Sequence, residues 1–131
     1  MGMTEEERTK RGREIRKKVH ADVVPDYASE PGTFPDITVR NIYNDIWGRE
    51  VMPIRDRRLM VMGALAAMTL IDPLEIHLRS ALALGELSWK EVDEFGVALS
   101  PYIGAPKTTY VLKLIGKLKR EEAEKKAKPA E

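Results

Sequence analysis

Apolar residues recur along most of the chain at the three- and four-residue spacing of amphipathic helices, and no segment keeps the alternation typical of a strand. Four stretches carry such a stripe: Val39, Ile42, Tyr43, Ile46 and Trp47; Leu74, Leu78, Ala81 and Leu82; Val92, Phe95 and Leu99; and Tyr110, Val111, Leu114, Ile115 and Leu118. The stretch 55–70 is apolar nearly all round and predicts a central helix. With a charged first helix over about 4–19, the pattern predicts an all-α fold of about six helices.

Capping residues, glycines and prolines set the predicted helix boundaries. Capping-box spacing occurs twice, in Thr4 with Glu7 and in Ser88 with Glu91. Asp72 and Pro73 form a cap followed by a proline at the first helical position of the fourth helix. The second helix is expected from Asp36 to Gly48, and the fourth is expected to stop at Gly85.

Proline positions divide the rest of the chain. The segment 20–35 is rich in proline and is expected to be a surface loop, Pro101 is expected to end the fifth helix, and Pro106 to open the sixth. From Lys119 the sequence has no apolar face and is expected to extend the sixth helix into solvent and to fray into a tail. We therefore expect one compact domain over residues 1–131, with a core at about 4–118 and a charged C-terminal tail at 119–131.

Composition excludes several classes of function. The 131 residues include 22 Lys and Arg against 21 Asp and Glu, a net charge of +1, so nucleic acid and anionic membranes are not expected partners. There is no cysteine, which excludes disulfides, thiolate zinc sites and thiol redox chemistry, and two histidines make a metal site unexpected. The longest apolar run, 59–71, is shorter than the roughly 20 residues of a membrane span, and no stretch resembles a signal peptide, so neither a span nor a leader is expected. A cytoplasmic location is expected.

His77 is the most informative single residue for chemistry. It lies at the edge of the apolar stripe of the fourth helix, where an imidazole with a pKa of ~6.5 could transfer a proton near neutral pH. A buried histidine that only bonds to a neighbouring helix would give the same pattern. Both interpretations stay open.

Arg55, Arg57 and Arg58 form a basic cluster at the start of the third helix. Cations at this end oppose the helix dipole by roughly 0.3–1 kcal/mol each, so another reason for them is expected. Guanidinium groups could receive the carboxylates of a substrate. They could equally pair with Asp56, Glu50 or acidic residues of another subunit.

Other polar and aromatic residues have structural interpretations. Glu91 and Glu94 lie in the first turns of the fifth helix, where acidic side chains suit the dipole. His20 is assigned little function, and Trp47 and Trp89 are interpreted as packing or interface residues.

In order along the chain, these motifs resemble the carboxymuconolactone decarboxylase family, within the alkylhydroperoxidase D-like superfamily. The matching parts are the arginine-rich entry Arg55–Met68, Glu75 with His77, Ala81–Gly85, Glu91 with Glu94, and Tyr102, Gly104 and Pro106. The match spans roughly residues 7–116. The chain has Leu-Glu-Ile-His where Glu-Leu-x-x-His is usual, so Glu75 stands two places before the histidine rather than four.

The resemblance implies a cofactor-free lyase with no metal, which converts γ-carboxymuconolactone (4-carboxymuconolactone) to 3-oxoadipate enol-lactone and CO2 in the degradation of aromatic compounds. His77 would be the general acid/base, and Arg58, with Arg55 or Arg57, would bind the carboxylates. The peroxidase branch uses a Cys-x-x-Cys pair; the equivalent positions are Leu70 and Pro73, so thiol peroxidase activity is not expected.

The resemblance also implies a homo-oligomer, a trimer or a hexamer, with a small carboxylated molecule as ligand. A non-catalytic helical oligomer that binds a small ligand is the alternative. For the lyase, helix geometry places Arg58 and His77 about 10 Å apart along a hairpin of the third and fourth helices, suited to the two ends of a small dicarboxylate.

Overall fold

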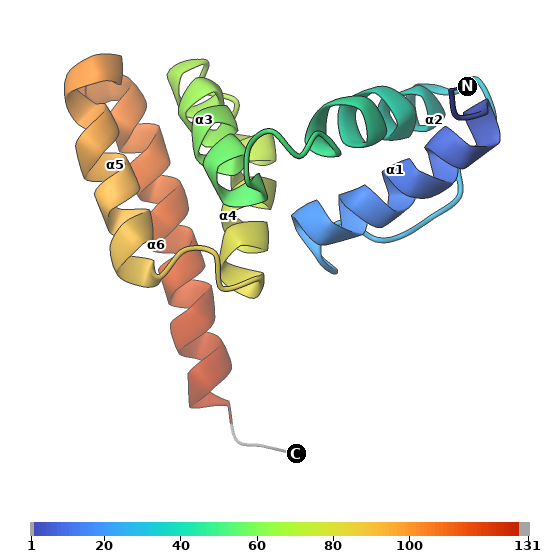
Figure 1. The fold of residues 1–131 in the computed structure, drawn as a ribbon. Helices are drawn as coiled ribbons and strands as arrows, with labels where there is room; N and C mark the ends of the chain where they lie inside the picture. Colours follow the sequence, from blue (N-terminus) through green and yellow to red (C-terminus); the bar gives the residue numbers. More distant parts are fainter. Residues whose placement is uncertain (1, 129–131) are drawn as a thin grey trace. The chain divides into compact units, whose positions relative to one another are not determined.

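The computed structural model describes residues 2–128, and in that range it is helical with no β-strand, which confirms the all-α prediction (Figure 1). Its elements are α1 (Glu5–His20), α2 (Phe34–Thr38), the π-helix η1 (Val39–Trp47), α3 (Ile54–Ala67), α4 (Ile71–Ala83), α5 (Trp89–Ile103) and α6 (Ala105–Ala127). None of the helices within residues 2–128 is long and apolar enough to cross a membrane.

By its internal contacts the chain divides into two compact units, unit 1 (Met1–Leu59) and unit 2 (Met60–Glu131). Helix α3 begins in unit 1 and ends in unit 2. Each unit has its own buried apolar residues. The single domain expected from the sequence stays a prediction.

Unit 1 is built on the packing of α1 against η1, which run side by side in Figure 1, and α2 also contacts η1. Ile15 and Val19 of α1 are buried together with Val39 and Trp47 of η1. Gly12 permits this packing, since a Cβ atom at this position would lie 2.1 Å from the carbonyl oxygen of Val39. The two backbones therefore meet with no room for a side chain between them.

The second helical segment differs from the prediction in its periodicity. It begins at Phe34 rather than Asp36, and from Val39 it is a π-helix, closed by an N–H···O bond of 2.8 Å from Gly48 to the carbonyl of Tyr43. The wider turn buries Asn44, whereas Ile42 and Ile46 are 42% and 51% exposed. The predicted stripe assumed 3.6 residues per turn, and the π-helix has more.

Arg11 of α1 satisfies the carbonyl groups at the end of η1. Its Nη1 donates to the backbone oxygen of Asn44 (3.1 Å) and to Oδ1 of the same residue (2.9 Å), and its Nη2 donates to the oxygen of Gly48 (2.9 Å). The terminal carbonyls of a helix have no partner within the helix. A side chain of α1 thus caps η1.

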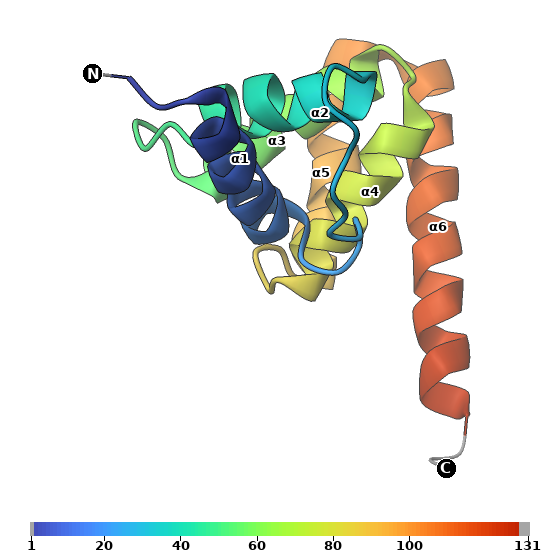
Figure 2. The same ribbon diagram turned by 90° about the vertical axis from the view of Figure 1, so that its right-hand side faces the viewer.

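Unit 2 packs α5 and α4 against α6. Its core is apolar and comprises Met62, Ala66, Leu74, Leu78, Ala81, Leu87, Val92, Val111, Leu114, Ile115 and Leu118. Figure 2 shows that the C-terminal part of α6 projects beyond α4 and α5. Most of the predicted stripe of α6 is buried, but Tyr110 is 52% exposed and does not belong to it.

Four charged side chains join α4 to α6. Glu75 accepts hydrogen bonds of 2.9 Å from Arg79 and from Lys117, and Arg79 also donates to Glu121 at 2.7 Å. The contact with Glu121 lies in the region expected to be a charged tail. Helix α6 continues to Ala127, as the expected helical extension, and residues 129–131 of the expected tail lie outside the described residues.

The helix starts were predicted better than the helix ends. Both capping boxes are present: the side-chain oxygens of Thr4 and Ser88 accept from the N–H groups of Glu7 (3.1 Å) and Glu91 (3.2 Å). The expected cap at Asp72 is wrong, because α4 begins at Ile71 and has no side-chain cap.

The prediction that Pro101 ends the fifth helix is also wrong, since α5 continues to Ile103. A proline inside a helix cannot donate to the carbonyl four residues before it. Here that carbonyl belongs to Val97 and accepts instead from the hydroxyl of Ser100 at 2.8 Å.

Candidate functional site

Arg58 is buried inside unit 1. It is 1% exposed, its Nη2 donates to the backbone oxygen of Val19, and its guanidinium lies over the ring of Trp47 at 5.9 Å. The second turn of α3 thus holds a cation against the C-terminal turn of α1 and against an indole of η1. The role of Arg58 as a carboxylate anchor stays a prediction.

Arg57 is the residue of the basic cluster with an unsatisfied donor. It is 9% exposed, and its Nη2 donates to the backbone oxygen of Arg49 at 3.3 Å, while its buried Nε has no hydrogen-bond acceptor among the described residues. It makes no ion pair with a carboxylate of residues 2–128. A buried donor without an acceptor costs about 1–3 kcal/mol, so an anionic oxygen brought by a ligand would relieve it. Arg55 is half-buried.

His77 lies on α4 in unit 2 and is buried, at 8% exposed, beside Leu74, Leu78 and Ala81. Its place at the edge of the apolar stripe is as the sequence predicted. Arg58 belongs to unit 1 and His77 to unit 2. The expected spacing between them, and the expected pocket that both would reach, stay predictions.

A second polar cluster in unit 1 surrounds His20, to which sequence reasoning assigned little function. His20 is 3% exposed and meets the ring of Tyr43 edge to face, with centroids 5.7 Å apart. Arg16, one turn before His20, is 4% exposed and donates to the backbone oxygen of Tyr27 at 3.1 Å. Its guanidinium lies over the Tyr27 ring, 4.6 Å from the ring centroid. Only tertiary packing brings these residues together, so no local pattern marks them.

Burial and neighbouring charge act in opposite directions on Tyr43. Burial raises the pKa of its phenol above the ordinary value, and the nearby guanidinium groups of Arg16 and Arg58 lower it by smaller amounts. Tyr43 is therefore a neutral hydrogen-bond donor near pH 7. The positive charges of Arg16 and Arg58 thus act on the Tyr43 phenol.

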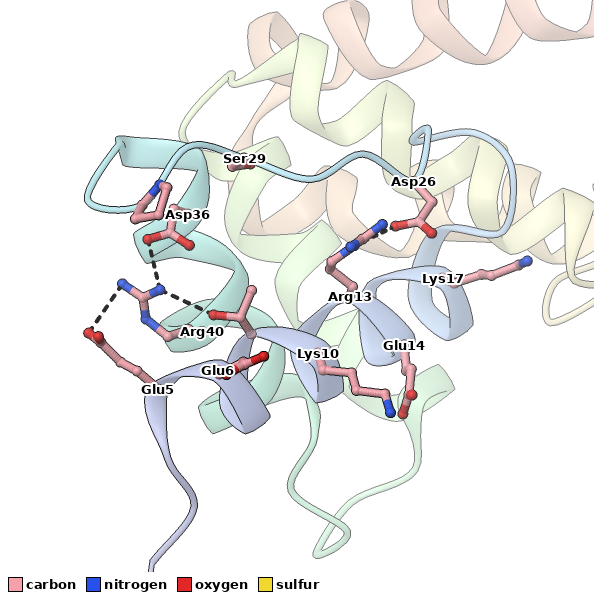
Figure 3. A pocket seen from close by; sticks show the side chains of 12 residues that line it. Glu5, Glu6, Lys10, Arg13, Glu14, Lys17, Asp26, Ser29, Asp36 and Arg40 are labelled. Carbon is pink, nitrogen blue, oxygen red and sulfur yellow. Dashed lines mark hydrogen bonds and ion pairs between the residues drawn. The ribbon is translucent and has the colours of Figure 1, made fainter.

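The larger described cavity of unit 1 has a volume of about 710 Å³ and lies between α1, the segment 21–33 and the start of η1 (Figure 3). Each end is built from ion pairs. At one end, Arg40 donates to the buried carboxylate of Asp36 (2.7 Å) and to the hydroxyl of Thr9 (3.2 Å). The backbone N–H of Gly32 and the guanidinium of Arg40 lower the pKa of Asp36.

The other end of this cavity is closed by Asp26. Its carboxylate accepts from Arg13 at 3.0 Å and from Arg16 at 3.4 Å, and Arg13 above all lowers its pKa. None of the residues predicted to form the site lines this cavity. Its charged residues were missed because charges on an amphipathic helix normally face solvent.

A smaller cavity of about 410 Å³ lies at the start of α3, and none of Arg55, Arg57 and Arg58 lines it. Trp47, Pro53 and Ile54 are among its apolar lining residues, and Arg49, whose backbone oxygen accepts from Arg57, also lines it. Its volume is in the range of small-molecule sites. The indole of Trp47 thus borders the cavity and also lies near the guanidinium of Arg58.

Residues 2–128 contain no group of three or more acidic or histidine side chains arranged to hold a metal ion. The donors that unit 1 offers are instead guanidinium, phenol and imidazole groups, which suit an anion. No model of a protein family, no curated protein and no solved structure matches the chain.

Proposed function

We propose that this protein is a cofactor-free lyase that resembles γ-carboxymuconolactone decarboxylase and releases CO2 from a small carboxylated lactone. The order of motifs from Arg55 to Pro106 supports the family. The observation that carries the proposal is the buried guanidinium of Arg57, whose Nε lacks an acceptor. A carboxylate of the substrate would supply that acceptor and balance the buried charge.

The proposed reaction needs a carboxylate anchor and a proton donor. Breaking the bond between the ring carbon and the leaving carboxylate releases CO2 and leaves an electron pair, which the conjugated lactone takes up as an enolate. Arg58, with Arg55 or Arg57, would hold the carboxylates, and His77 would deliver the proton that completes the enol-lactone. No cofactor takes part in these steps.

The proposal also includes self-association and location. Exposed apolar side chains in both units support assembly into a trimer or hexamer, as the resemblance implies. Met60 of α3 is 57% exposed, although the sequence predicted a covered central helix. A cytoplasmic location remains part of the proposal.

A non-catalytic protein that binds a small acid is the second candidate. It is favoured by the cavity of about 410 Å³ beside Trp47, which could take a ligand without any reaction. The two candidates share Arg57 as an anion-binding group. They differ in the role of His77, because only the lyase needs it as a proton donor.

The test is to mix the purified protein with 4-carboxymuconolactone and measure CO2 release. His77→Gln is expected to lower kcat by about 100-fold or more, the usual effect of removing a general acid. Arg57→Lys is expected to raise KM about tenfold, because an ammonium cannot replace the planar fork of a guanidinium. Arg120→Lys is the matched control, since the exposed Arg120 side chain lines neither described cavity and makes no hydrogen bond among the described residues, and it should change neither constant more than about twofold.

Failure of the wild-type protein to release CO2 above background would reject the decarboxylase. If the lactone still binds and Arg57→Lys weakens binding while His77→Gln does not, the non-catalytic candidate is supported. Equal effects of Arg57→Lys and Arg120→Lys would remove the anion-binding role of Arg57.

A further inference from the structure

The cavity of about 710 Å³ in unit 1 has an excess of negative charge at the end next to the start of α1 (Figure 3). The charged lining residues at this end are Glu5, Glu6, Asp36 and Arg40, so three carboxylates meet one guanidinium. Arg40 donates to Asp36 at 2.7 Å and lies 3.7 Å from Glu5. The carboxylate of Glu6 makes no hydrogen bond or ion pair among residues 2–128, so it can accept from a ligand.

The opposite end of the cavity has an excess of positive charge. Its charged lining residues are Arg13, Lys17 and Asp26, so two cations meet one carboxylate. Arg13 donates through Nε to Asp26 at 3.0 Å, and its two Nη groups make no hydrogen bond among the described residues. The ammonium of Lys17 also makes no hydrogen bond or ion pair in that part of the chain. An anionic group at this end would therefore meet donors that are still available.

The middle of the cavity is polar and carries no net charge. Lys10 and Glu14 lie between the two ends on α1, have opposite charges and make no ion pair within residues 2–128. Ser29 lies on the segment 21–33, is half-buried, and its hydroxyl makes no hydrogen bond to any described residue. A bound chain of methylene groups would leave these polar groups without partners, whereas the N–H and C=O groups of a peptide could bond to them.

The spacing of the charged ends suits a molecule of about three residues. Glu6 and Arg13 are seven residues apart on α1, which is about 10 Å along the helix axis. An extended tripeptide also spans about 10 Å between its terminal ammonium and its terminal carboxylate. The cavity volume is in the range of small-molecule sites.

We propose that this cavity binds a short zwitterionic peptide, with its ammonium group at Glu6 and its carboxylate at Arg13 and Lys17. A ligand with one charged end would leave the excess charge at the other end of the cavity unpaired, so it would bind more weakly. The segment 21–33 would form the opposite wall, fastened to α1 by the ion pair of Arg13 with Asp26. The site is separate from the proposed lyase, because none of the residues assigned to the lyase lines this cavity.

The test uses the intact chain labelled with ¹⁵N and observed by NMR, with triglycine as the probe. N-acetyl-triglycine lacks the ammonium group and triglycine amide lacks the carboxylate, so each control keeps the peptide groups and removes one charge. Triglycine is expected to shift the amide signals of α1 and of the segment 21–33 in a saturable way and to leave those of α5 in place. Each control is expected to bind about three- to fivefold more weakly, because it lacks one partly exposed ion pair.

Two substitutions test the two ends separately. Glu6→Gln is expected to weaken triglycine binding about threefold and to leave the binding of N-acetyl-triglycine unchanged, because that peptide has no ammonium group. Lys17→Gln should weaken triglycine binding by a similar factor and leave that of triglycine amide unchanged. Both side chains are exposed and unpaired, so neither change should unfold the protein. Glu94→Gln and Lys90→Gln remove the same charges from exposed positions of unit 2 and should leave all affinities unaltered.

The outcomes separate the peptide site from the lyase. The absence of a saturable shift with triglycine, equal affinities of the three peptides, or equal effects of the site and control substitutions would each overturn the peptide site. Release of CO2 without triglycine binding would support the lyase and overturn the peptide site. Triglycine binding with the expected charge dependence but without CO2 release would support the peptide site and reject the lyase.

Discussion

At Gly12 the backbone of α1 lies against the backbone of η1. A Cβ atom there would be 2.1 Å from the oxygen of Val39 and 2.9 Å from its carbonyl carbon, and neither is the end of a flexible side chain. The helices would have to separate to admit a methyl group. Because Val19, Val39 and Trp47 are buried in the same unit, a separation would loosen its core.

Gly12→Ala is therefore expected to lower the free energy of unfolding by about 1–3 kcal/mol, although alanine is the better helix former by about 1 kcal/mol. Urea unfolding measures the change. Gly63→Ala is the matched control, because its Cβ would meet only the side chain of Leu99 at 3.9 Å, and it should stabilise the protein or leave it unchanged. Equal effects of the two substitutions would show that the close approach at Gly12 has no energetic consequence.

At the scale of single residues, the sequence predicted part of the candidate site. The arginine cluster was identifiable because cations at a helix start oppose the helix dipole, and two of its three members are buried. Their partners were not identifiable. The oxygen of Val19 and the ring of Trp47 approach Arg58 from other helices, and that approach depends on tertiary packing.

At the scale of helices, local signals predicted starts and missed changes of periodicity. A capping box is a bond between residues three apart, so Thr4 with Glu7 was sufficient to locate the start of α1. The end of the π-helix is capped by Arg11, which is more than 30 residues away from the carbonyl groups that accept from it. No stretch of η1 read alone contains that information.

The ion pairs between α4 and α6 make the stability of unit 2 depend on pH. Hydrogen bonds from Lys117 and, to a smaller extent, from Arg79 lower the pKa of Glu75 below its ordinary value of 4.5. Burial of the carboxyl opposes part of this shift. A carboxyl whose pKa is lowered by folding stabilises the protein above its unfolded pKa, and this contribution is lost as the pH falls through the folded pKa.

Glu75→Gln is therefore expected to lower the free energy of unfolding by about 1 kcal/mol at pH 7 and to have a much smaller effect at pH 2. Urea unfolding at the two pH values measures the difference. Glu94→Gln is the control, since Glu94 is exposed and makes no ion pair within residues 2–128. A Glu75→Gln effect that is the same at both pH values would exclude the ion pairs as its cause.

At the scale of the whole molecule, the exposed apolar side chains bear on assembly. Met60 and Met68 are 57% and 59% exposed, and Val97 and Tyr102 are 61% and 87% exposed. Single exposed apolar residues are common on monomers, but in the proposed trimer or hexamer these four residues are candidates for the interface. The sequence predicted that α3 needs cover, and it could not specify what covers it.

Sedimentation equilibrium is expected to give a mass three or six times the 14.8 kDa of one chain. Met60→Glu should lower that mass to the monomer, because a charge would have to be buried in the interface. Ala123→Glu, on the exposed charged part of α6, makes the same kind of change and should leave the mass unaltered. A monomeric wild-type protein would end the proposal of a trimer or hexamer.

The segment 21–33 forms one wall of the cavity of about 710 Å³, and its length can change during evolution with little loss of stability. It is fastened to α1 at Asp26 and Tyr27 by Arg13 and Arg16, and no helix includes it. Closing a loop twice as long costs only about 0.6 kcal/mol more in chain entropy. Insertions beyond Tyr27 could therefore enlarge or reshape the cavity while the packed helices of unit 1 keep their contacts. A change in the length of this segment is thus a route to a different ligand specificity at a small cost in chain entropy.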